Sequence, residues 1–86
     1  MTHYLSDLKI GETRIISGFD TARLDDRAFA ENLEDRLLEI GFEEGLSVEL
    51  LHKGPIGGDP IAVRIGFMTV ALRKMEAEAI ILENIA

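Results

Sequence analysis

The sequence predicts a mainly β fold: a small closed or half-closed barrel of about five strands, with one α-helix and a short helical turn before the last strand. Short runs rich in apolar and β-branched residues are separated by glycine-containing turns. A single stretch has apolar residues at helical spacing. With 86 residues, the chain is expected to form one domain, residues 1–86. Closing the sheet would also protect its edges from other chains.

The first elements are a capped turn and a strand. Residues 5–8 are predicted to form one helical turn, with Ser6 as a possible cap. Residues 13–19 (TRIISGF) are rich in strand-forming residues and predict the first strand. Gly18 within it indicates a β-bulge or a sharp bend.

An amphipathic helix is predicted between the start signals Asp25 and Asp26 and the stop signal Gly41. Its apolar residues recur at intervals of three and four and therefore share one face: Ala30, Leu33, Leu37 and Ile40, widened by Phe29. Acidic residues occupy most of the rest of the surface. The apolar face can pack on the barrel or face a second copy, so self-association is left open.

The second half of the chain predicts three further strands and the helical turn. Apolar residues at alternate positions from Ile61 to Ile65 indicate a half-buried strand. The composition of RKMEAE favours a helical turn. The predicted elements are strands over 46–53, 61–65, 69–72 and 79–83, with the helical turn over 73–78.

The connection GPIGGDP, residues 54–60, is predicted to be a rigid loop. A Walker-type phosphate loop needs a Lys and a Ser or Thr after its glycines, but here Asp59, which repels phosphate, follows them. Gly54 and Gly58 are predicted to supply positive φ angles. Pro55 and Pro60 fix φ and lack an amide donor. Such a loop can also present a binding surface at the rim of the barrel.

Composition and charge limit the possible partners. The net charge of −7 disfavours nucleic acid and anionic lipid. The absence of cysteine excludes disulfides, zinc ribbons, iron–sulfur clusters and thiol catalysis. The N-terminus does not resemble a signal peptide, and no apolar run approaches the roughly 20 residues that span a bilayer. We therefore expect a cytoplasmic protein without direct membrane insertion.

Catalytic and metal-binding signals are weak. The serines lie in no nucleophile motif, so neither an enzyme nor a cofactor is predicted. The histidines are His3, in the terminal tail, and His52, near a strand end. His52 and Asp59 form the best available metal pair, but two ligands make at most an open site. A small protein that binds, senses or buffers a divalent transition metal is therefore the alternative hypothesis.

Four segments resemble, in order, the FeoA family of bacterial ferrous iron uptake: LSDLKIGE (5–12), RLLEIGFEEG (36–45), GPIGGDPIAV (54–63) and VALRKMEAEAI (70–80). The resemblance implies an SH3-like barrel. It also implies an accessory role beside FeoB, the membrane iron permease with a GTP-hydrolysing domain, through protein contact rather than catalysis. The family has no agreed catalytic residues, so none is assigned.

Residues 20–33 look long for this family, which indicates a longer helix or an added surface loop. A related barrel ends the iron-dependent repressors of the diphtheria toxin repressor type, where it follows a DNA-binding domain. The present sequence contains no helix-turn-helix segment, so a repressor is not predicted. The predicted contact surface for the permease is apolar: Pro55 and Ile56 in the rigid loop, with Leu37 and Met75 as neighbours.

Overall fold

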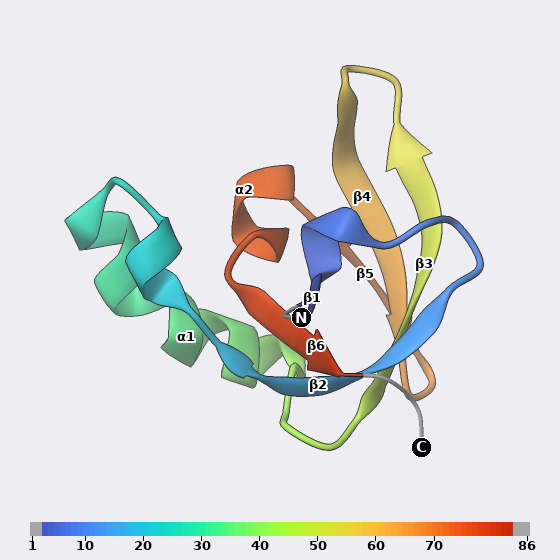
Figure 1. Cartoon of the computed structure of the whole chain (residues 1–86), viewed down its shortest axis with the longest axis horizontal. Helices are drawn as coiled ribbons and strands as arrows, with labels where there is room; N and C mark the ends of the chain where they lie inside the picture. The colour runs from blue at the N-terminus through green and yellow to red at the C-terminus, as the bar shows by residue number, and fades with distance from the viewer. Residues whose placement is uncertain (1–2, 84–86) are drawn as a thin grey trace.

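The computed structural model describes residues 3–83, so the predicted ends of the domain, 1–2 and 84–86, lie outside it. One six-stranded antiparallel sheet has the order β1-β6-β2-β3-β4-β5. It curves around the core without closing, as in the half-closed form of the prediction (Figure 1). The elements are β1 (His3–Tyr4), η1 (Leu5–Asp7), β2 (Thr13–Phe19), η2 (Thr21–Arg23), α1 (Arg27–Ile40), β3 (Ser47–Gly54), β4 (Gly58–Ile65), β5 (Met68–Leu72), α2 (Lys74–Ala77) and β6 (Ile80–Glu83).

The predicted strands are confirmed with small shifts, and one strand was missed. β2 has the predicted bounds, and its pairing with β6 shifts between Ile16 and Gly18, which is the predicted bulge. β4 begins at Gly58 rather than at Ile61. β1 pairs His3 with Leu82, so His3 belongs to the sheet and not to a tail. Two residues are too few to show an alternating pattern.

The turn before β2 is closed by backbone groups and by Glu12. Tyr4, not Ser6, occupies the N-cap position of η1, and no side chain caps it. The Glu12 carboxylate accepts the backbone N–H of Lys9 at 2.8 Å. That hydrogen bond lowers the pKa of Glu12, because it favours the charged carboxylate.

Helix α1 begins and ends as the sequence predicts. The Asp26 carboxylate accepts the N–H of Phe29 at 3.0 Å, and Gly41 ends the helix with φ of 118°. The apolar stripe faces the sheet, with three members buried: Ala30, Leu33 and Leu37. Before the helix, the segment that looked long forms η2, where the Arg23 guanidinium donates to the Glu78 carbonyl at 2.7 Å.

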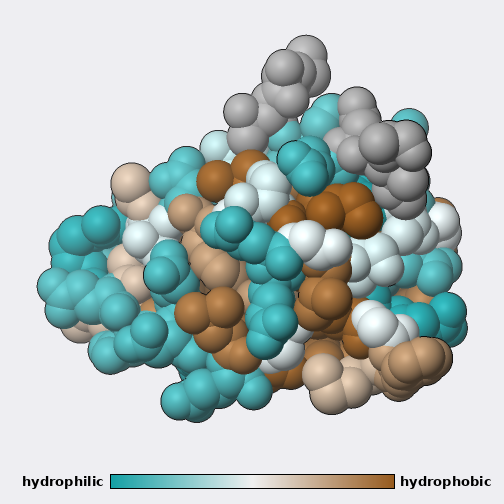
Figure 2. All heavy atoms as spheres, turned by 90° about the horizontal axis from the view of Figure 1, so that it is seen from below, coloured by the Kyte–Doolittle hydropathy of each residue, from teal (hydrophilic) through white to brown (hydrophobic). Residues whose placement is uncertain are grey.

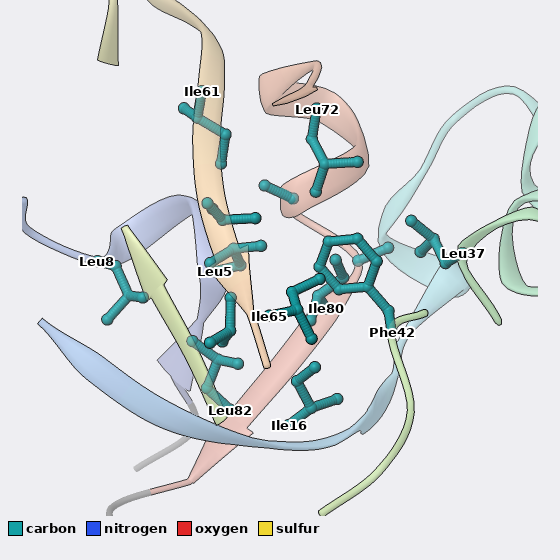
Figure 3. Packing of buried hydrophobic residues seen from close by; sticks show 14 of the residues in the cluster. Leu5, Leu8, Ile16, Leu37, Phe42, Ile61, Ile65, Leu72, Ile80 and Leu82 are labelled. Carbon is teal, nitrogen blue, oxygen red and sulfur yellow. The ribbon is translucent and has the colours of Figure 1, made fainter. Parts of the chain in front are cut away.

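The core lies on the concave side of the sheet. Alternate strand residues point into it, including Ile16, Val63 and Ile65. Phe42, which follows α1, is fully buried in the gap between the helix and the sheet (Figure 3). Helix α1 extends to one side of the molecule in Figure 1. Packing of its buried residues and of Phe42 against the core attaches it to the sheet.

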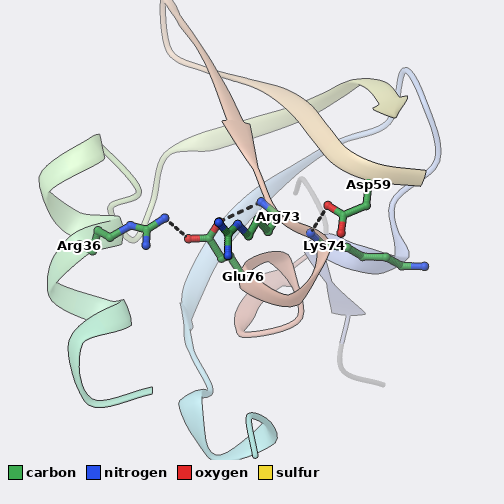
Figure 4. Close-up of polar contacts among 5 residues, drawn as sticks. All are labelled: Arg36, Asp59, Arg73, Lys74 and Glu76. Carbon is green, nitrogen blue, oxygen red and sulfur yellow. Dashed lines mark hydrogen bonds and ion pairs between the residues drawn. The ribbon is translucent and has the colours of Figure 1, made fainter. Parts of the chain in front are cut away.

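A polar tether joins the two helices. Glu76 in α2 is 2% exposed and forms an ion pair with Arg36 of α1 (Figure 4). Its other carboxylate oxygen accepts the N–H of Arg73 at 2.8 Å. Both oxygens of this buried group are therefore satisfied, as burial requires.

None of the helices within residues 3–83 is long and apolar enough to cross a membrane.

Candidate partner-binding site

The tip of the β3–β4 hairpin is a tight turn from Ile56 to Asp59. The N–H of Asp59 donates to the carbonyl of Ile56 at 3.1 Å. The two central residues, Gly57 and Gly58, have φ of 62° and 85°. Positive φ at both central positions is typical of the two-residue hairpin turn that matches strand twist. The predicted positive φ at Gly58 is confirmed.

Gly54 has a different role from the one predicted, because its φ is not in the left-handed region. A Cβ atom at this position would lie 2.4 Å from the Asp59 carbonyl oxygen. The two strands therefore approach each other so closely that only glycine fits. The Asp59–Pro60 peptide bond on the opposite strand is cis.

The turn is also fastened from the side. The Asp59 carboxylate accepts the backbone N–H of Lys74 at 3.0 Å (Figure 4). Lys74 is the first residue of α2, so the hairpin is linked to the end of β5 and the start of the helix. Hydrogen bonds within the turn and to α2 support the predicted rigidity of this loop.

A shallow, mainly apolar depression lies beside the turn. It has a volume of about 330 Å³ and is lined by Ile56, Asp59, Pro60 and Arg73. Ile56 is 80% exposed, although its side chain is large and apolar. An exposed apolar side chain next to a partly apolar hollow is a feature of protein contact sites.

The structure sets one of the four predicted contact residues apart from the other three. Pro55 and Ile56 are exposed on the turn, and Met75 is 41% exposed on α2. Leu37 is 0% exposed, so the prediction that it belongs to an accessible surface is wrong. It lies in the apolar stripe of α1 and points towards Phe42 in the core (Figure 3).

Two residues of the depression, Pro60 and Arg73, were not predicted. β4 and β5 are antiparallel, and Ile61 pairs with Leu72. Pro60, which precedes Ile61, therefore lies next to Arg73, which follows Leu72. Strand alternation gives no register between two strands, so this proximity has no signal in the sequence. Phe67 in the β4–β5 turn is also strongly exposed, at 108%, and Ile10 in the turn before β2 is 61% exposed.

The alternative metal pair gains no further ligand. His52 is exposed, because a shift in the β3–β4 register after Leu50 interrupts the alternation of the strand. The Asp59 carboxylate already accepts the Lys74 N–H. Within residues 3–83, no group of three or more His, Cys, Asp or Glu side chains could hold a metal ion. This arrangement does not favour a metal site at His52 and Asp59.

Comparison with known proteins identifies the family. The FeoA domain model matches residues 3–84. The chain belongs to the FeoA family. A search of curated proteins found no match for this FeoA-family protein. The family links the chain to ferrous iron transport and supports the predicted SH3-like fold.

Solved FeoA structures have the same fold. FeoA of Stenotrophomonas maltophilia, solved with zinc and described as an SH3 domain protein, is 32% identical, with a TM-score of 0.72 over 96% of this chain and 89% of that one. Iron(II) transport protein A of Clostridium thermocellum is 30% identical, with a TM-score of 0.77 over 96% of this chain and 46% of that one. A manganese-dependent transcriptional repressor is 20% identical, with a TM-score of 0.76 over 98% of this chain and 37% of that one, and shows a shared fold alone.

Proposed function

We propose that this FeoA-family protein is a non-enzymatic accessory protein of ferrous iron uptake. It acts in the cytoplasm by contact with the cytoplasmic domain of the FeoB permease. Family membership supports the link to iron transport, and FeoA of Stenotrophomonas maltophilia has itself been suggested as a ferrous iron transport activating factor. The observation that favours protein contact is the exposure of the Ile56 side chain, which is 80% exposed on a rigid turn.

The contact is made by the hairpin-tip surface, defined as Pro55, Ile56, Pro60, Arg73 and Met75. The turn is fixed before binding, because hydrogen bonds within it and to α2 hold its backbone. A preformed surface loses little conformational entropy on association. Burial of one large aliphatic side chain contributes about 1.5–3 kcal/mol, which is the size expected of the main anchor of a contact.

The test is co-purification with the cytoplasmic domain of the FeoB permease from the same organism, followed by calorimetry in the GDP-bound and GTP-bound states. Ile56→Asp and Pro55→Asp are the test variants. Phe67→Asp is the matched control, because it places the same charge on the other exposed glycine turn. We expect Ile56→Asp to weaken binding by roughly 30-fold or more. Phe67→Asp should bind as the unchanged protein does.

Two results would contradict the proposal in different ways. No binding of the unchanged protein in either nucleotide state would exclude the permease as partner. If Ile56→Asp, Pro55→Asp and Phe67→Asp all bound equally well, the permease would remain the partner, but the contact would lie elsewhere than on the hairpin. Since all three positions are exposed, loss of folding should not complicate the comparison.

A further inference from the structure

The charges of this acidic protein are unevenly distributed. Residues 25–44 contain eight carboxylates and two arginines, so this stretch accounts for six of the seven net negative charges. It includes α1, which extends from one side of the molecule in Figure 1, and hydrophilic side chains cluster at that end in Figure 2. The β3–β4 hairpin projects in another direction (Figure 1).

Three basic residues lie at or beside the hairpin tip. Arg73 lines the depression, and Lys74 is the next residue along the chain. Lys53 lies in β3, on the other side of the hairpin, and its Cδ atom would be 3.9 Å from a Cβ added to Gly58. All three are exposed. In the part of the chain that the structure describes, none of them forms an ion pair.

The single carboxylate at this site is already engaged. Asp59 lines the depression, but one of its carboxylate oxygens accepts the Lys74 backbone N–H. Of the two acids that follow Lys74, Glu76 is buried and paired with Arg36, and Glu78 is half-buried. Within residues 3–83, three basic side chains therefore face the two unpaired acids Asp59 and Glu78. The basic side chains are therefore available to groups from outside, and the local charge is opposite in sign to that of the protein as a whole.

We propose that the hairpin-tip surface recognises an acidic segment of its protein partner, one apolar side chain of which enters the depression beside Ile56. Carboxylates that flank this apolar residue meet Lys53, Arg73 and Lys74. This inference rests on the proposed function, since the partner is the permease, and it specifies the chemistry of the segment that is bound. Charge complementarity of this kind governs association rate and selectivity, and salt weakens it.

A pair of variants at one position gives the sharpest test. Ile56→Asp and Ile56→Lys both remove the apolar anchor, but they add opposite charges. An acidic segment should tolerate the lysine better, so we expect Ile56→Lys to bind the permease domain roughly fivefold more tightly than Ile56→Asp in 50 mM salt. The difference should shrink in 500 mM salt, because ions screen exposed charges.

A second comparison reverses a charge without changing the anchor. Arg73→Glu and Lys74→Glu should each weaken binding roughly fivefold to tenfold at low salt. Arg64→Glu is the control for net charge, on an exposed residue of β4 four positions beyond Pro60; because it also removes the Arg64–Glu49 ion pair, its folding is checked by circular dichroism. It should change affinity less than about twofold.

The outcomes separate this inference from the proposed function. Binding that does not depend on salt, with equal affinities for Ile56→Lys and Ile56→Asp, would overturn the acidic segment and leave the permease contact intact. Absence of binding by the unchanged protein would overturn both. A third outcome is that the unchanged protein sediments as a dimer and Arg73→Glu as a monomer. The surface would then bind the acidic α1 of a second copy, and the proposal of a permease segment would be overturned.

Discussion

Helix α1 and the β3–β4 hairpin both contain apolar residues that the sequence placed on one contact surface, but the environments of these residues are opposite. Leu37 of α1 is 0% exposed, whereas Ile56 of the hairpin is 80% exposed. The helix is held by its apolar stripe and by the Arg36–Glu76 ion pair. The hairpin tip is held by backbone geometry and by hydrogen bonds to main-chain groups.

This difference separates stability from recognition. Residues of the α1 stripe are part of the hydrophobic core, so changes there should lower the free energy of unfolding. The side chains at the hairpin tip point into solvent, so changes there should affect partner binding and leave folding unaffected. The hairpin glycines and Asp59 are the exceptions, because the glycines set the path of the backbone and the Asp59 carboxylate accepts the Lys74 N–H.

The largest effect expected from this comparison comes from truncating the two residues in parallel. Leu37→Ala removes a fully buried side chain and should lower the free energy of unfolding by about 2–5 kcal/mol. Ile56→Ala should change it by less than about 0.5 kcal/mol. Urea denaturation followed by circular dichroism measures both. A large loss of stability in Ile56→Ala would show that this side chain packs within its own chain.

A backbone test should have the next largest effect. In Gly54→Ala the new Cβ would meet the Asp59 carbonyl oxygen at 2.4 Å, so the strands must separate, at a cost of about 1–3 kcal/mol. Gly18→Ala is the control in another strand, since its nearest contact is at 3.7 Å and its φ is not positive. Thermal denaturation should show a lower midpoint for Gly54→Ala alone. Equal midpoints would mean that the hairpin adapts without strain.

Breaking the tether between α1 and α2 should have an effect of similar size. Arg36→Met removes one partner of the buried Glu76 carboxylate and should destabilise by about 1–3 kcal/mol. Adding Glu76→Gln should recover part of this loss, because a neutral amide is less costly to bury than an unpaired charge. A double-mutant cycle by chemical denaturation measures the coupling. Strictly additive losses would show that the two groups do not interact in solution.

The smallest effect is expected at the beginning of α1. Asp26→Ala removes the N-cap acceptor of the Phe29 N–H and should cost about 1 kcal/mol. Asp26→Asn, which keeps a side-chain oxygen at the cap, is the control and should lie close to the unchanged protein. Hydrogen exchange of the first-turn amides would locate the loss. Unchanged protection in Asp26→Ala would mean that the cap is not needed.

Local patterns in the sequence determined most elements of this protein. The alternation of Ile61, Val63 and Ile65 predicts a half-buried strand, and Asp26 and Gly41 mark the ends of the helix, because these signals depend on neighbouring residues in one element. Glycine and proline in residues 54–60 predicted a shaped turn for the same reason. The order of the four motifs also indicated the FeoA family, which the domain model confirms.

Tertiary structure alone decided which apolar residues remain exposed and which residues meet at the hairpin tip. Leu37 and Ile56 are equally apolar, but only packing of α1 on the core buries the first. Pro60 and Arg73 line one depression because β4 and β5 pair in one particular register, which no local pattern specifies. Burial and strand register depend on contacts between residues distant in the chain, so they appear only when the whole sheet is formed.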